Sequence, residues 1–268
     1  MKIKRIYLEN FRNYEAQEIN LEDNMNVFYG NNAQGKTNIL EALYFCALGR
    51  SFRTHKESEL IHFGEEKAKI VIDFEKNNLE KKIEFILNKS ERKKILLNGI
   101  KINKNSELLG NMNLVLFSPD DIIILKESPA SRRKFLDILI SQLRPNYAHI
   151  LGEYNKILDQ RNAMIKSKKL DTIDIWDEQL TNNAEKIYEY RKEYIEKLQT
   201  HIENISQNIT NNKENLRINY KSKFVNKESF LKLLKDCIQI DLYRGFTTNG
   251  IHRDDFDIFV NNKELKEF

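Results

Sequence analysis

The chain has 268 residues and a net charge of +4, with 40% hydrophobic and 31% charged residues, which indicates a globular protein with a heavily solvated surface. No run approaches the length of a membrane span and residues 1–5 lack an apolar signal core, so the composition excludes a membrane protein and favours the cytoplasm. Cys46 and Cys237 lie far apart in apolar surroundings, which favours reduced thiols over a disulfide framework.

The first predicted elements are two short strands. Residues 2–8 alternate in polarity, and residues 18–21 are expected to pair with them as a hairpin. The connection, residues 10–14, is polar and aromatic. Arg12 in this turn is a candidate phosphate ligand, and a neighbouring aromatic ring could stack on a base.

Residues 30–37 have the spacing of a phosphate loop, which is a Gly, four free residues and then Gly-Lys-Thr. Residues 27–29 before it predict a strand, and an apolar helix is expected to run to residue 48. The candidate nucleotide-binding residues are Gly30, Asn31, Asn32, Ala33, Gln34, Gly35, Lys36 and Thr37. Lys36 would reach the outer phosphates, and Thr37 would help to coordinate Mg²⁺. The alternative, a glycine-rich turn with one exposed lysine, explains the flanking strand and helix less well. The loop therefore predicts a nucleoside triphosphate site.

After this helix, Arg50 and Arg53 lie in a loop that could be a solvated turn or part of the nucleotide site. The pattern then becomes antiparallel. Residues 68–74, 82–88 and 94–102 predict strands, with Asn98-Gly99 as a tight turn, and residues 114–117 predict another strand. The lysines at these edges could protect the sheet from aggregation or follow a nucleic-acid backbone.

Asp73 ends an apolar strand and could hold Mg²⁺ in a small-molecule kinase. Its setting among hairpin-connected strands favours a structural role, because a parallel core strand would need a crossover helix.

From residue 119 the sequence becomes helical. Pro129 opens a helix that Pro145 ends, and apolar residues then recur at helical spacing over residues 180–209, with a break at Arg191. These residues form either a helix packed in its own lobe or an extended coiled-coil arm. Residues 217–220 and 256–260 predict strands. His252, which precedes Asp254 by two residues and Asp255 by three, could belong to a metal or acid–base site or to a polar turn.

Several segments together resemble the RecF family of bacterial recombination mediators, which are related to SMC-type ATPase heads. They are residues 8–14, 30–37, 49–53, 118–129, 132–137 and 252–255, and the resemblance runs from residue 1 to residue 268. Glu127 and Ile251 differ from the family pattern, which has Gly and Pro there. Arg132 and Arg133 fall in a family motif, with a role in DNA contact, nucleotide contact or a lobe interface left open.

The resemblance implies an α/β fold, with an ABC/SMC-type phosphate-loop ATPase lobe that contains an antiparallel β subdomain, and a second, helical lobe. The expected boundaries are residues 1–117 for the ATPase lobe, 118–242 for the helical lobe, and 243–268 for strands that return to the ATPase lobe.

The resemblance also implies an ATP-dependent, DNA-binding recombination mediator in DNA repair and replication, with ATP and Mg²⁺ as cofactors. ATP would close a homodimer on double-stranded DNA near single-strand gaps, and the protein would work with RecR to load RecA. The family's signature motif and its metal-binding acidic strand are expected beyond residue 268. No catalytic residue is therefore assigned here, and this chain is expected to bind ATP without turnover. The alternative is the kinase that would use Asp73.

Overall fold

The computed structural model describes residues 1–118 and 128–265, which divide into two compact units, Met1–Leu116 and Phe117–Phe268. Pro119, Asp120 and Glu127 of the family motif lie outside the described residues. Along the stretches that the structure describes, every helix is too short or too polar to cross a bilayer.

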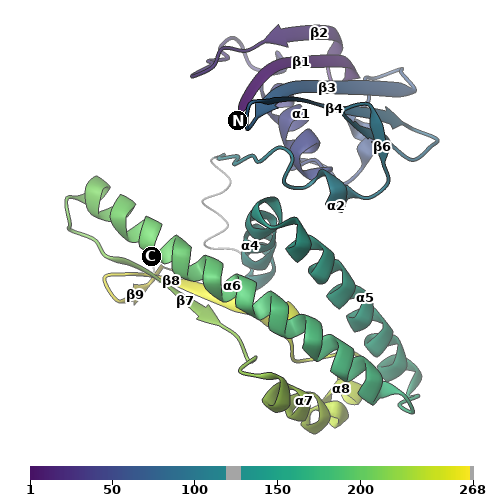
Figure 1. Ribbon diagram of the computed structural model, residues 1–268, viewed down its shortest axis with the longest axis vertical. Coiled ribbons are helices and arrows are strands. Elements are labelled where there is room, and N and C mark those ends of the chain that lie inside the picture. Colours follow the sequence, from purple (N-terminus) through teal and green to yellow (C-terminus); the bar gives the residue numbers. More distant parts are fainter. Residues whose placement is uncertain (119–127, 266–268) are drawn as a thin grey trace. The chain divides into compact units, whose positions relative to one another are not determined.

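The first unit is built on a six-stranded antiparallel sheet in the order β2-β1-β3-β4-β5-β6 (Figure 1). The strands are β1 (Lys2–Phe11), β2 (Tyr14–Asn20), β3 (Lys67–Lys76), β4 (Leu79–Asn88), β5 (Lys94–Leu97) and β6 (Ile100–Ile102). Short helical turns are η1 (Glu57–Leu60) and α2 (Asn105–Leu108). Alternate residues such as Ile70 and Ile72 are fully buried, as the period-two pattern predicts.

Helix α1 (Lys36–Leu48) covers one face of this sheet. The Phe45 ring packs edge-on against Phe85 of β4, with the ring centroids 4.9 Å apart. Cys46 is buried beside it, and burial raises the pKa of its thiol. Both cysteines are free thiols, as expected.

The two predicted hairpins of the first unit are confirmed. Tyr7 pairs with Glu18 across β1 and β2. Asn98 and Gly99 both have positive φ, at 53° and 81°, which is the backbone that a two-residue turn between twisted strands requires.

Two predicted strands are wrong, because residues 27–29 and 114–117 are irregular in the structure. Val27, Tyr29 and Val115 are 70%, 91% and 88% exposed. A strand needs a neighbour to complete its backbone hydrogen bonds, and within the described ranges none of the nine strands pairs with either segment.

The second unit combines long helices with a three-stranded sheet in the order β7-β8-β9 (Figure 1). Its elements are α4 (Pro129–Leu143), α5 (Pro145–Ser167), α6 (Ile173–Thr210), β7 (Leu216–Lys221), α7 (Lys227–Asp236), α8 (Ile238–Arg244), η3 (Ile251–Arg253), β8 (Asp255–Val260) and β9 (Lys263–Glu264). Tyr154, Leu180 and Ile187 belong to one apolar core that α5 and α6 share with β7 and β8.

Two expectations concern this unit. Helix α6 is continuous through Arg191, so the break in the apolar pattern is a buried charged residue inside a single helix. Residues 243–268 fall in the second unit, where β8 pairs with β7 from Lys221↔Asp255 to Leu216↔Val260, and their expected return to the ATPase lobe stays a prediction.

Candidate nucleotide-binding site

The phosphate loop, residues 30–37, connects the irregular residues 27–29 to the first turn of α1. Its backbone takes positive φ at Gly30 (143°), Ala33 (63°) and Gly35 (96°). Residues 30–34 and Thr37 are exposed. Gly35 is the N-cap of α1, and the first turn of this helix contains no acidic side chain. The positive end of the helix dipole is therefore available to an anion at this loop.

Gly35 is required by close packing as well as by its backbone angle. A Cβ at this position would lie 2.7 Å from both Asn13 Oδ1 and Tyr14 Oη. The turn between β1 and β2 thus lies directly against the loop, and a larger residue at position 35 would displace it.

Lys36 turns back over the loop. Its Nζ donates hydrogen bonds to the carbonyl oxygens of Gly30, at 2.8 Å, and Asn31, at 2.6 Å. The cation therefore lies against the backbone of the loop, where a bound phosphate could accept the same donor.

Thr37 supplies one exposed hydroxyl next to Lys36. One neutral oxygen from the protein suits Mg²⁺, because this ion retains several waters and takes further ligands from phosphates. One oxygen would be too few for a metal site made by the protein alone. Among the residues that the structure describes, no group of three His, Cys, Asp or Glu side chains could hold a metal ion.

Arg12 lies beside this loop but points its guanidinium into α1. Its Nε and Nη2 donate to the two carboxylate oxygens of Glu41, at 2.9 and 2.6 Å, and Nη1 donates to the Glu59 carbonyl. Its predicted contact with nucleotide stays a prediction. Glu41 was not predicted, although a single acid inside the apolar run of residues 39–43 was a signal in the sequence.

Asp73 has the structural role that the antiparallel pattern favours. Its Oδ2 accepts from Arg5 Nε at 2.7 Å, and Oδ1 lies 3.7 Å from Lys82 Nζ. Because β3 pairs antiparallel with both β1 and β4, Asp73 does not end a parallel core strand, and the geometry gives no support to the kinase alternative.

The two charged family segments of the second unit meet each other. Arg132 binds Asp255 through two parallel hydrogen bonds of 2.8 Å, and Arg133 Nη1 donates to the Asp254 carbonyl at 2.7 Å. Arg132 and Asp255 are 123 positions apart in the sequence, and their pairing joins the first turn of α4 to the start of β8. This pairing of charged groups supports a role in holding the unit together.

Arg191 forms the centre of the same charged cluster. It is 2% exposed, and its Nη2 donates to Asp137 at 2.9 Å, while its Nη1 donates to the Ile251 carbonyl at 2.8 Å. Asp254 lies 3.5 Å from Nη1 and also accepts from the Tyr220 hydroxyl. Burial raises the pKa of Asp254 to about 6, although the Tyr220 hydrogen bond and Arg191 oppose the shift.

His252 uses both ring nitrogens inside the protein. Nδ1 lies 2.8 Å from the Tyr154 hydroxyl, and Nε2 lies 3.1 Å from the Thr247 carbonyl. Because a carbonyl only accepts, Nε2 carries the proton and Nδ1 accepts from Tyr154. Burial lowers the pKa of His252 to about 4, so the ring is neutral at pH 7. This geometry fits the polar-turn interpretation of the sequence.

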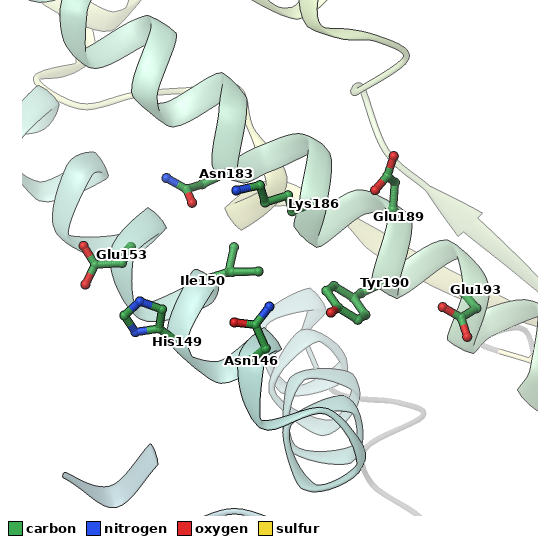
Figure 2. Close-up of a pocket in the computed structure, with 9 residues that line it drawn as sticks. All are labelled: Asn146, His149, Ile150, Glu153, Asn183, Lys186, Glu189, Tyr190 and Glu193. Atoms are coloured by element: carbon green, nitrogen blue, oxygen red, sulfur yellow. The ribbon is translucent and has the colours of Figure 1, made fainter. Parts of the chain in front are cut away.

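A polar cleft of about 530 Å³ lies between α5 and α6 in the second unit (Figure 2). Its side chains include His149 and Glu153 from α5 and Lys186 and Glu193 from α6. It contains none of the predicted nucleotide-binding residues.

The comparisons with known proteins match an AAA domain family and a set of RecF proteins. The profile of a family described as an AAA domain covers residues 5–244. DNA replication and repair protein RecF from Clostridium beijerinckii is 44% identical, over 100% of this chain and 75% of its own length. The RecF protein from Clostridium acetobutylicum is also 44% identical, over 100% of this chain and 76% of its own length. A solved structure of the recombination mediator protein RecF-ATP in the RecFOR pathway has 36% identity and a TM-score of 0.92, and the similarity covers 100% of this chain and 75% of that one.

These identities confirm the resemblance seen in the sequence, and the TM-score confirms the expected fold class of an ATPase lobe with an antiparallel β subdomain and a second, helical lobe. The chain belongs to the RecF family of DNA replication and repair proteins.

Proposed function

We propose that this chain binds ATP and Mg²⁺ at the phosphate loop and acts as part of an ATP-dependent, DNA-binding recombination mediator. The observation that carries the proposal is the loop of residues 30–37. It places the Lys36 cation and the first turn of α1 at a loop in which residues 30–34 are exposed and the backbone has positive φ at Gly30 and Gly35.

In this proposal the triphosphate oxygens replace the carbonyls of Gly30 and Asn31 as acceptors for Lys36 Nζ. The exchange is favourable because a hydrogen bond from an ammonium to a charged oxygen is stronger than one to a neutral carbonyl. Thr37 would provide one ligand to Mg²⁺, which neutralises phosphate charge when it is bound.

We further propose that ATP closes a homodimer on double-stranded DNA near a single-strand gap, and that the protein works with RecR to load RecA. Support comes from the relatives, which are named as DNA replication and repair proteins, and from the similar RecF-ATP structure of the RecFOR pathway. The net charge of +4 is compatible with a polyanionic partner.

The Lys36→Ala variant tests this proposal. We expect its affinity for a fluorescent ATP analogue to fall at least about tenfold, because the compact positive charge at the phosphates is lost. In the full-length protein we also expect ATP to stop increasing the sedimentation coefficient and the DNA affinity. Lys89→Ala is the matched control for ATP binding, since Lys89 is an exposed lysine directly after β4 that lies 3.7 Å from Glu66. Unchanged ATP binding by Lys36→Ala would overturn the assignment of the loop.

A further inference from the structure

Glu41 is a fully buried acid in the second turn of α1. It is 0% exposed, and Ile39, Ala42 and Leu43 around it are buried apolar residues. A buried carboxylate is costly unless it is fully paired. Glu41 meets this requirement by accepting hydrogen bonds from three side chains.

The donors to Glu41 come from two segments outside α1. Arg12, at the end of β1, binds both carboxylate oxygens. Ser51 Oγ donates at 2.5 Å and Arg53 Nη1 at 3.3 Å, both from the loop that follows α1. A single carboxylate thus fixes the turn before the phosphate loop and the loop after its helix to the same face of α1.

The contacts continue from Arg53 to the phosphate loop through Asn38. Arg53 Nη1 also donates to Asn38 Oδ1 at 2.8 Å, and Asn38 Nδ2 donates to Asn13 Oδ1 at 2.7 Å. Asn38 and Glu41 are three residues apart and therefore share one face of the helix.

The last member, Asn13, lies against Gly35. Asn13 Oδ1 and Tyr14 Oη occupy the space that a Cβ on Gly35 would fill. We call this connected set the Glu41 network: Glu41, Arg12, Ser51, Arg53, Asn38 and Asn13.

We propose that Glu41 is a positioning residue for the phosphate loop, which acts through Arg53 and Asn38 to hold Asn13 and Tyr14 against Gly35. Its effect on ATP affinity rests on the proposed function. Its effect on the conformation of Gly35 does not, and can be measured without nucleotide.

The test is an NMR measurement of the Gly35 amide in the nucleotide-free protein. Gln34-Gly35 is the single Gln-Gly pair in the sequence, so labelling Gln with ¹³C at the carbonyl and Gly with ¹⁵N selects this amide. In the ¹⁵N spectrum, which contains every glycine, we expect Glu41→Gln to shift the Gly35 resonance while Gly99 and Gly152 keep their positions. We also expect the affinity for ATP to fall about tenfold.

Asn38→Ala provides a second variant in case Glu41→Gln fails to fold, because alanine is a better helix former than asparagine. It breaks the network next to Asn13, and we expect the same shift of Gly35. Asp73→Asn is the control, because it removes an arginine-bound carboxylate from the same unit at the Arg5 pair.

The outcomes are separable. A Gly35 resonance that stays in place in both folded variants overturns the positioning role. Failure of the unmodified protein to bind ATP, with Gly35 still shifted by the variants, overturns the proposed function and leaves the positioning role standing.

Discussion

The phosphate loop and the Arg191 cluster use positive charge in opposite ways. Lys36 lies in an exposed loop and donates to two neutral backbone carbonyls. Arg191 is buried between the carboxylates of Asp137 and Asp254. A cation that the protein already pairs with its own acids stabilises the fold, whereas a cation held by neutral acceptors can gain energy from an incoming anion. The comparison therefore separates the charged residues that support structure from those that can bind a ligand.

Removing the buried cation should produce the largest effect. We expect Arg191→Ala to lower the free energy of unfolding of the second unit by about 3–5 kcal/mol, because two acids lose their buried partner. Urea unfolding followed by fluorescence measures this unit, since Trp176, the single tryptophan, lies on α6. Lys197→Ala, at the exposed pair with Glu193, should change stability by less than about 1 kcal/mol. An equally small effect of Arg191→Ala would remove the contrast between the two regions.

The next effect depends on pH. The pKa of His252 is about 4 in the folded protein and 6.5 without the protein environment, so the folded state disfavours the protonated ring. Its contribution to stability is present above pH 6.5 and is lost as the pH falls towards 4, by up to about 3 kcal/mol.

The measurement is the difference in unfolding free energy between the unmodified protein and His252→Gln at several pH values. This difference should shrink from pH 7 to pH 4.5. Asp254 has the opposite sign, because its pKa is raised to about 6 and its contribution is lost as the pH rises through 6. It is present in both proteins and largely cancels in the difference. A difference that is constant with pH would show that His252 is not buried in its neutral form.

A pair of glycine substitutions tests the ligand-binding region. We expect Gly35→Ala to cost about 2 kcal/mol and to abolish ATP binding, because φ is 96° and the new Cβ would meet Asn13 and Tyr14 at 2.7 Å. Gly152→Ala should stabilise α5 by about 1 kcal/mol, since nothing lies within 4 Å of a Cβ in this helix. Calorimetry measures the stability of both variants, and ATP titration measures their affinity for ATP. Normal ATP binding by Gly35→Ala would refute the close packing at the loop.

The smallest effect is expected at Asp73. Asp73→Asn weakens a partly exposed pair with Arg5, so stability should change by about 1 kcal/mol or less, and ATP affinity should not change. A large loss of Mg²⁺-dependent ATP binding in this variant would restore the kinase alternative.

Local sequence signals predicted the elements whose structure is determined locally. The phosphate loop precedes a helix as expected, and Asn98-Gly99 forms its turn, because the required backbone angles depend on the residues at those positions. Strands at residues 27–29 and 114–117 were predicted wrongly, because an apolar run does not reveal whether a pairing partner is present.

The charged contacts could not be predicted from one sequence. Arg132 and Asp255 are 123 residues apart, and Arg191 interrupted an apolar pattern without indicating its partners. Glu41 was visible as an acid in an apolar helix, but the convergence of Arg12 and Arg53 on it depends on how β1 and the loop after α1 pack.

Helix α6 contains 38 residues and is therefore about 57 Å long. Arg191 lies near its midpoint and is bound to Asp137 of α4 and to the Ile251 carbonyl of η3. Arg191 thus connects the middle of α6 to α4 and η3. A displacement of either end of α6 would strain these same charged contacts. A tilt of α6 therefore requires α4 and η3 to move with it.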